Sequence, residues 1–129
     1  MIGAIIGDIV GSRFEWDNHR SKDFDLLTHK CFFTDDSVMS LAVCDALMKC
    51  KADHSNLSEQ AVRSMQSVGR PYPHCGYGGS FRRWMYSDNP KPYNSYGNGA
   101  AMRVSGCGYV GRTIDEVKQL SRAVTEVTH

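Results

Sequence analysis

Phe33-Thr34-Asp35-Asp36-Ser37 introduces the longest apolar helical pattern of the sequence. Thr34 is a good N-cap, and Asp35 and Asp36 then occupy the first two helical positions, where the positive end of the helix dipole favours acids. One stripe at helical spacing follows, with three residues that broaden it: Met39, Val43, Ala46, Leu47 and Cys50, then Val38, Leu41 and Ala42. The pattern predicts a mostly buried helix at the centre of the fold, with two carboxylates at its head.

The two carboxylates have a structural and a chemical interpretation. In the structural one they only stabilise the start of the helix. In the chemical one Thr34, Asp35 and Asp36 together supply hard oxygen ligands, the kind that Mg²⁺ or Ca²⁺ prefers. A helix that runs into the core would hold such ligands rigidly, as a metal site requires. The spacing alone leaves both interpretations open.

The first eleven residues are apolar but predict neither a membrane anchor nor a signal peptide. They are too short to span a bilayer, contain Asp8 and lack a cationic start. They predict instead a short buried helix with one apolar face, formed by Ile2, Ile5, Ile6, Ile9 and Val10. Gly3, Gly7 and Gly11 make a smooth strip where another backbone could approach closely.

Glu15 lies between Phe14 and Trp16, directly after this first predicted helix. If the carboxylate is enclosed, its pKa would be raised, as is common at a catalytic site. An ordinary surface acid is the alternative. Residues 17–32 show no sustained period, and we interpret them as a loop that lies over the core.

The 129 residues suggest one compact domain, long enough to bury about two-thirds of the surface that its unfolded chain exposes. The 15 basic and 14 acidic residues are spread along the chain, so no basic face indicates nucleic acid or a membrane. The five cysteines contain no Cys-x-x-Cys, and we interpret them as reduced thiols of a cytoplasmic protein. A zinc site of His29 with Cys31, or of His74 with Cys75, is an alternative that lacks paired ligand spacing.

Further helical patterns make the predicted fold class all-α. Asn56-x-x-Glu59 is a capping box for a helix with Val62, Met65 and Val68 inward. A short helix is expected near residues 80–86. Thr113-Ile114-Asp115-Glu116 is a second capping box, and its helix runs to His129 without a stop signal. The inward residues of this last helix are Val117, Leu120, Val124 and Val127.

Residues 71–99 are rich in glycine, proline and tyrosine. A long connection of this kind is usually functional or disordered, and the aromatic content argues against disorder. Asn98 could cap a helix that starts near Gly99, whose exposed backbone N–H groups would then be free to bind a phosphate. We interpret the segment as a ligand surface, with plain turn chemistry as the alternative.

Five stretches of the sequence carry a resemblance to a known family. In chain order they are Gly3-Ala-Ile-Ile-Gly-Asp-Ile-Val-Gly-Ser-Arg-Phe-Glu15, Phe33-Thr-Asp-Asp-Ser-Val38, Gly76-Tyr-Gly-Gly79, Ser95-Tyr-Gly-Asn-Gly-Ala-Ala-Met-Arg-Val104 and Val124-Thr-Glu-Val-Thr-His129. In this order they are similar to the N-terminal half of an ADP-ribosylglycohydrolase, a mostly helical family. The resemblance spans nearly the whole chain, which makes it specific although each stretch alone is weak.

The resemblance implies a dinuclear Mg²⁺ site to which Thr34, Asp35 and Asp36 contribute, with both aspartates taking part in catalysis. Glu15 matches a catalytic acid that the family places on a movable loop near the scissile bond. Two loops would hold the pyrophosphate of ADP-ribose: Tyr77, Gly78 and Gly79, and Ser95, Tyr96, Gly97, Asn98 and Gly99. The implied reaction is hydrolysis of an N- or O-glycosidic bond at the ribose anomeric carbon of an ADP-ribosylated substrate.

The sequence departs from the family in two places. Gly106-Cys107-Gly108 stands where the family commonly has a Ser-Pro turn. The family's second metal motif, an Asp-x-Asp followed by Thr or Ser, is absent. We therefore expect residues 1–129 to form a single, apparently truncated domain with a partial metal site.

Three functional hypotheses follow. The chain is part of a hydrolase whose remaining metal ligands come from a complementing C-terminal half, a module that binds ADP-ribose or a nucleotide without cleaving it, or an inactive remnant. Since the glycine strip and part of the central helix would lack their usual partners, self-association is also expected.

Overall fold

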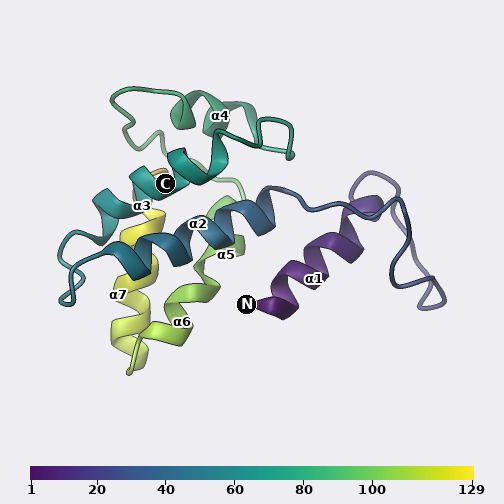
Figure 1. Cartoon of the computed structure of the whole chain (residues 1–129), viewed down its shortest axis with the longest axis horizontal. Coiled ribbons are helices and arrows are strands. Elements are labelled where there is room, and N and C mark those ends of the chain that lie inside the picture. The colour runs from purple at the N-terminus through teal and green to yellow at the C-terminus, as the bar shows by residue number, and fades with distance from the viewer.

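The computed structural model describes all of residues 1–129 and consists of helices and loops, as the sequence predicts. The elements are α1 (Ile2–Gly11), the 3-10 helix η1 (Ser12–Phe14), α2 (Asp35–Lys49), α3 (Leu57–Gly69), α4 (Gly79–Met85), α5 (Gly99–Arg103), the 3-10 helix η2 (Val104–Gly106), α6 (Cys107–Val110) and α7 (Ile114–Thr125). In Figure 1, α2 runs through the middle, with α3 and α4 on one side and α5, α6 and α7 on the other. No helix is long and apolar enough to cross a bilayer.

The central helix α2 forms as its sequence predicts. The Thr34 hydroxyl accepts a hydrogen bond from the Asp36 backbone N–H at 3.3 Å and caps the helix. The predicted stripe is buried, namely Met39, Val43, Ala46 and Leu47, together with Val38 and Ala42. Leu41 is the exception, because it is 47% exposed and lies on the outer side of the helix.

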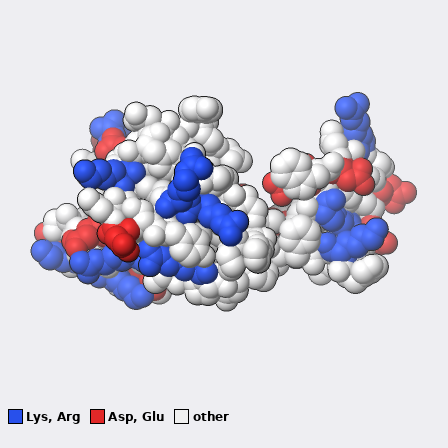
Figure 2. Space-filling view, turned by 90° about the horizontal axis from the view of Figure 1, so that it is seen from above, with Lys and Arg blue, Asp and Glu red and all other residues white.

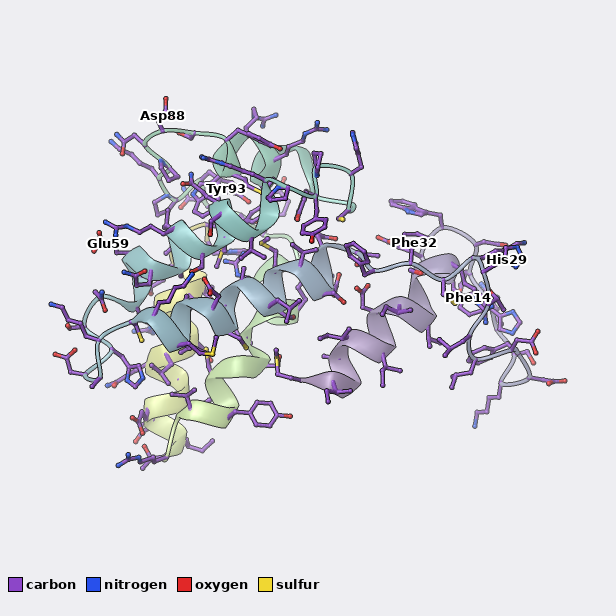
Figure 3. The ribbon with its side chains drawn as sticks, in the orientation of Figure 1. Phe14, His29, Phe32, Glu59, Asp88 and Tyr93 are labelled. Atoms are coloured by element: carbon purple, nitrogen blue, oxygen red, sulfur yellow. The ribbon has the colours of Figure 1, made fainter.

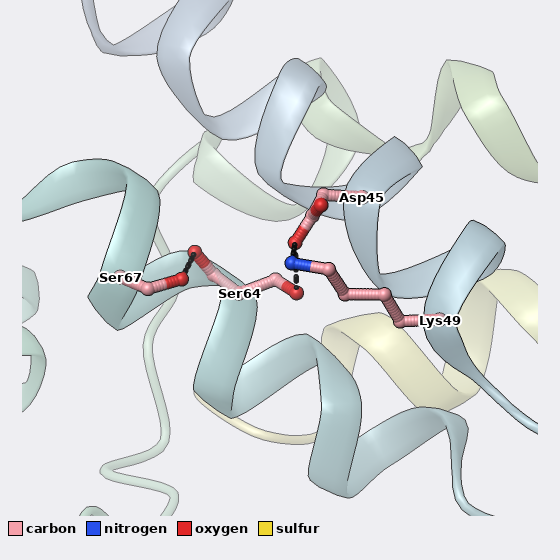
Figure 4. Close-up of polar contacts among 4 residues, drawn as sticks. All are labelled: Asp45, Lys49, Ser64 and Ser67. Atoms are coloured by element: carbon pink, nitrogen blue, oxygen red, sulfur yellow. Dashed lines mark hydrogen bonds and ion pairs between the residues drawn. The ribbon is translucent and has the colours of Figure 1, made fainter.

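Helix α3 packs along α2 and closes the core on that side (Figure 1). Leu57, Ala61 and Met65 are fully buried in this contact. A polar contact lies at the edge of this helix pair. Asp45 of α2 accepts hydrogen bonds from the Ser64 hydroxyl at 2.7 Å and from the Lys49 ammonium at 2.8 Å (Figure 4). The two helices are therefore held by apolar burial and by one shared carboxylate.

The segment from α5 to α7 covers the other side of α2. Gly106 allows the close approach, because a Cβ at this position would lie 2.6 Å from the Cys44 sulfur. Cys107, Leu120 and Val124 complete the core. Helix α7 begins at its predicted cap, with the Thr113 hydroxyl accepting from the Glu116 N–H at 3.2 Å. It ends at Thr125 and not at His129 as predicted.

The N-terminal arm (residues 1–33) differs from the main body (residues 34–129). In Figure 2 the arm extends from the main body as a smaller lobe, and both signs of charge occur on both lobes. The helix α1 forms as predicted, but the prediction that it is buried is wrong: none of its residues is buried, and Ile2 is 75% exposed. The glycine strip is also open, since no heavy atom lies within 4 Å of a Cβ built at Gly3, Gly7 or Gly11.

The loop that follows α1 does not lie over the core, contrary to the sequence interpretation. It packs on itself within the arm, where the rings of Phe14, His19 and Phe24 lie 5.0 to 5.6 Å apart. The guanidinium of Arg13 lies over the Phe14 ring and donates to Thr28 at 2.8 Å and to the Asp25 carbonyl. The aromatic residues of this loop therefore form a small cluster of their own, separate from the core.

Candidate active site

One carboxylate ties the arm to the head of α2. Asp8 of α1 accepts hydrogen bonds from the backbone N–H and hydroxyl of Thr34, at 2.8 and 2.5 Å, and from those of Ser37, at 3.2 and 2.6 Å. Both hydroxyl residues are buried. The Ser37 N–H is one of the groups that the first helical turn leaves without a helical partner. Asp8 therefore completes the start of α2 from another element.

Asp35 is held against the loop that precedes α4. Its backbone N–H donates to the Cys75 carbonyl at 2.7 Å. Gly76 follows in a left-handed conformation with φ +93°, and a Cβ there would lie 3.2 Å from Asp35 Oδ1. A side chain at residue 76 would therefore strain the backbone and crowd the carboxylate.

The acids at this point repel one another. Burial, followed by the negative charge of Asp36, raises the pKa of Asp35 to about 6, and the charges of Glu15 and Asp8 contribute to the shift. Burial and the charge of Asp8 also raise the pKa of Asp36. A proton or a cation bound here would relieve this repulsion.

A cavity of about 350 Å³ opens beside Asp35. Its walls come from the head of α2, from residues 78–81, from residues 93–99 with Met102 and Arg103, and from His129. The segments lie far apart in the sequence, and the main body brings them to one place. The cavity joins an acidic end at Asp35 to a wall of glycine-rich loops.

Most residues of the two predicted substrate loops line this cavity. Gly78 and Gly79 belong to its wall, as do all five residues from Ser95 to Gly99. Tyr77 does not line it, because its ring packs against Phe81 at 5.7 Å and its hydroxyl donates to the Gly69 carbonyl. The structure thus brings Asp35 and both loops together, with Tyr77 behind the wall.

Glu15 lies outside the cavity. It is exposed and follows η1 on the arm. Its neighbour Phe14 lies in the arm with His29 and Phe32, on the opposite part of the molecule from Tyr93 of the cavity wall (Figure 3). The charge of Glu15 still contributes to the raised pKa of Asp35.

The wall formed by residues 93–99 is held by the C-terminal turn rather than by a helix cap. The Thr128 carbonyl accepts from the N–H groups of Tyr93 and Ser95, at 3.3 and 3.1 Å. His129 Nε2 lies 3.1 Å from the Gly97 carbonyl. Asn98 precedes α5 as predicted, but its side chain makes no capping hydrogen bond, so that part of the prediction is wrong.

The donor atoms at the head of α2 suit a hard cation in part. The carboxylates of Asp35 and Asp36 are partly exposed, and the Thr34 hydroxyl lies 3.5 Å from Asp36 Oδ2. Oxygen donors of this kind match Mg²⁺. However, no group of three or more His, Cys, Asp or Glu side chains is arranged to hold a metal ion. The residues fit a cation in kind and supply only part of its coordination shell.

Two charged residues of this region were not identified as site residues from the sequence. Asp8 organises the head of α2, and Arg103 lines the cavity. One feature of the sequence could have identified both residues. Each is the single charged residue in a segment that is otherwise apolar or made of small residues. A charge in such a segment must find partners if the segment is buried.

Comparison with known proteins identifies similar sequences. The whole chain, residues 1–129, matches the family model described as ADP-ribosylglycohydrolase. The ADP-ribosylhydrolase ARH3 of Homo sapiens is 26% identical over 165 residues, and that of Xenopus tropicalis is 25% identical over 155 residues. Each alignment covers 100% of this chain and 43% of the relative. The chain thus spans less than half the length of the curated relatives it matches.

Proposed function

The chain belongs to the ADP-ribosylglycohydrolase family, and from this premise we propose that its cavity binds the ADP-ribosyl group of an ADP-ribosylated substrate. The observation that carries the proposal is that one cavity joins the Asp35 carboxylate to the glycine-rich loops of residues 78–81 and 93–99. The pyrophosphate would lie against these loops. The ribose would then lie at the Asp35 end.

The proposed reaction is hydrolysis of the glycosidic bond. The bond from the ribose anomeric carbon to the leaving nitrogen or oxygen breaks, a water oxygen bonds to that carbon, and a proton passes to the leaving group. Positive charge develops on the ribose as the bond breaks, and the proposed role of the Asp35 carboxylate is to stabilise it.

The proposed cofactor is Mg²⁺, held by Thr34, Asp35 and Asp36. When bound, it would orient the ribose hydroxyls and the attacking water. Glu15 is the remaining acid of the proposed machinery. Because Glu15 lies on the arm, its position relative to the cavity depends on how the arm sits on the main body.

The proposed site is incomplete on this chain alone. The acids at the head of α2 form one side of a metal site, so we propose that opposing carboxylates come from a second polypeptide segment, such as a complementing half. A module that binds ADP-ribose without cleaving it is the second candidate, supported by the loops lying wholly within this chain.

Binding is tested by titrating the chain with ADP-ribose and following backbone amides by NMR. We expect shifts in residues 78–81 and 93–99. Gly78→Leu should weaken binding at least about tenfold, because a Cβ there meets no atom within 4 Å and the side chain would fill the cavity. Gly108→Leu is the matched control, since it is equally open and lies outside the cavity. Equal binding by both variants would place the ligand elsewhere.

Metal binding is tested by Mn²⁺ relaxation. The parent should bind weakly, roughly in the millimolar range, because Mg²⁺-type ions give up water reluctantly when few protein ligands are present. The double variant Asp35→Asn, Asp36→Asn should lose the signal, whereas Asp115→Asn, an exposed acid at the start of α7, should keep it. Equal signals from all three proteins would remove this site.

Completeness is tested by a turnover assay and light scattering. With ADP-ribosylated peptide and Mg²⁺ we expect essentially no turnover by this chain alone. We also propose that the exposed apolar face of α1 drives self-association, because Ile2 and Ile6 are 75% and 49% exposed. Ile2→Lys should shift the chain towards monomer more than Ala4→Lys does. A monomeric parent with Mg²⁺-dependent turnover would contradict both proposals.

A further inference from the structure

Arg103 is the largest fully buried side chain of the molecule. It is 1% exposed, at the end of α5, and it lines the cavity that Asp35 also lines. A buried arginine normally pairs with a carboxylate, because burial costs a charged group free energy. None of the three ion pairs in the structure involves Arg103. Burial lowers the pKa of Arg103 to about 10, so the group remains charged at neutral pH.

The guanidinium of Arg103 also has unused hydrogen-bonding capacity. Nη2 donates to the Val124 carbonyl at 2.9 Å and to the Thr128 hydroxyl at 2.8 Å. Nε is buried and has no partner. An arginine presents five N–H donors, and buried donors without partners are uncommon in native structures. The guanidinium also lies over the Phe81 ring, 5.9 Å from its centroid, which is a weak contact for a cation. The chain therefore supplies no carboxylate to Arg103 and leaves part of its donor set without a partner.

Arg103 also supports one wall of the cavity through a short series of hydrogen bonds. Thr128, which accepts from Arg103, holds the N–H groups of Tyr93 and Ser95 with its carbonyl. The Thr128 hydroxyl lies 2.9 Å from His129 Nδ1, and the other ring nitrogen of His129 faces the Gly97 carbonyl. The position of the wall at residues 93–97 thus depends on where Arg103 holds Thr128.

The cavity has opposite charges in its lining. Asp35 is acidic and lies among other acids, whereas Arg103 is cationic and has no counter-charge. A ligand with a negative group at the Arg103 side would supply the missing charge. A neutral ligand would leave it unpaired.

We propose that Arg103 is the positioning residue for the anionic part of the ligand in this cavity, through its uncompensated charge and through its support of the wall at residues 93–97. The proposal rests on the proposed function only in taking this cavity as the ligand site. Inorganic pyrophosphate is therefore the probe, because it tests the charge without requiring that ADP-ribose binds or is cleaved.

The first experiment needs no substitution. The Nε–H of Arg103 is buried and should give a slowly exchanging signal in a ¹⁵N spectrum of the full chain. Pyrophosphate should shift this signal together with the amides of residues 93–99. A shift of the amides without the Arg103 signal, or the absence of both shifts, would overturn the proposal.

The second experiment compares Arg103→Met and Arg103→Lys with the parent. Arg103→Met should weaken pyrophosphate binding about tenfold or more, because it removes a charged hydrogen-bond donor. Arg103→Lys should restore part of the affinity, which a purely structural role in packing would not predict. Arg63→Met is the control for the loss of one positive charge, since Arg63 is exposed on α3 and away from the cavity.

The outcomes separate this inference from the proposed function. If pyrophosphate binding depends on Arg103 but ADP-ribose does not bind, the proposed function fails and the assignment of Arg103 stands. A folded Arg103→Met variant that binds pyrophosphate as tightly as the parent would overturn the assignment. If Arg103→Met does not fold, the Nε–H measurement on the parent decides.

Discussion

The main body and the N-terminal arm contain similar apolar helices but use them differently. In the main body, fifteen apolar residues form one buried core around α2. In the arm, Ser12 is the only buried residue, and the isoleucines of α1 remain at least partly exposed. The arm contacts the body at Met1, whose ammonium group donates to the Tyr109 hydroxyl at 2.8 Å. It also contacts the body through Asp8, which accepts four hydrogen bonds from Thr34 and Ser37.

The difference shows what helical spacing does and does not predict. Apolar residues at helical spacing predict a helix with one face that avoids water. They do not indicate whether the same chain supplies the surface that covers this face. For α2 the cover is α3 on one side and the segment from α5 to α7 on the other. For α1 these residues supply only partial cover, since Ile5, Ile9 and Val10 are half-buried and Ile2 and Ile6 are exposed. We propose that a further polypeptide segment covers the rest.

The largest expected effect separates buried from exposed methionine on the same helix. Met39 and Met48 both lie on α2, but Met39 is fully buried and Met48 is 80% exposed. Met39→Ala should lower the free energy of unfolding by about 2–5 kcal/mol, because it leaves a cavity in the core. Met48→Ala should change it by less than about 0.5 kcal/mol. Denaturant unfolding measures both.

The same comparison of buried and exposed apolar residues can be made between the core and α1. Ile2→Ala truncates an apolar side chain of similar size on α1 but should cost less than about 0.5 kcal/mol, since Ile2 is 75% exposed. A cost for Ile2→Ala comparable to that of Met39→Ala would mean that α1 is buried in solution, by self-association or by a different position of the arm. The measurement should therefore be repeated at several protein concentrations.

The second prediction breaks the polar connection between arm and body. Asp8→Ala removes the acceptor of four hydrogen bonds, two from buried hydroxyls. We expect the free energy of unfolding to fall by about 1–3 kcal/mol, because the donors at the head of α2 lose their partner. The amides of α1 should exchange with deuterium faster, roughly tenfold or more, since the arm then opens more readily.

The control for this prediction is Asp17→Ala, which removes an exposed acid of the arm. It should leave both the stability and the exchange of α1 unchanged. If Asp8→Ala behaves in the same way, the arm is not held by Asp8. If the amides in the middle of α3 also exchange faster, the arm is part of the core and the division into two regions is wrong.

The fold could be predicted where local signals act alone. The start of α2 follows from Thr34 and the start of α7 from Thr113, because each hydroxyl accepts from a backbone N–H within its own turn. Asn56 and Asn98 precede helices as predicted but do not cap them. Asn56 accepts from the Lys51 N–H instead, and Asn98 has a helical rather than an extended backbone.

The site could be predicted only in part from the residues themselves. The acids at the head of α2 are visible from spacing, but nothing local indicates that Asp35 shares a cavity with residues 93–99. That link came from the resemblance to a family, and the structure shows the adjacency. Asp8 and Arg103 were missed because their partners lie 26 and 21 or more residues away. Tertiary packing, which no local pattern encodes, brings these pairs together.

The smallest expected effect concerns the acid at the boundary between the two regions. Asp35 has a pKa of about 6 in the folded chain, above the ordinary value of 3.8, through burial and neighbouring acids that include Asp8 and Glu15 of the arm. The folded state therefore binds more protons than the unfolded state between these pH values. The stability that Asp35 contributes accordingly falls as the pH rises through this range and is lowest above pH 6.

Asp35→Asn should therefore raise the free energy of unfolding at pH 7.5, by about 1 kcal/mol once solvent screening of this partly exposed group is considered. Near pH 3.5 the parent carboxyl is mostly protonated in both states, so most of the difference should disappear. Asp115→Asn, an exposed acid in the first turn of α7, should give no stabilisation at either pH. Denaturant unfolding at the two pH values measures this effect. If Asp35→Asn lowers the free energy of unfolding, or changes it equally at both pH values, burial and the charges of the neighbouring acids do not destabilise the ionised Asp35. Two of these neighbours, Asp8 and Glu15, belong to the arm. The stabilisation by Asp35→Asn should therefore be smaller in an Asp8→Ala background, because one negative charge that repels Asp35 is already absent.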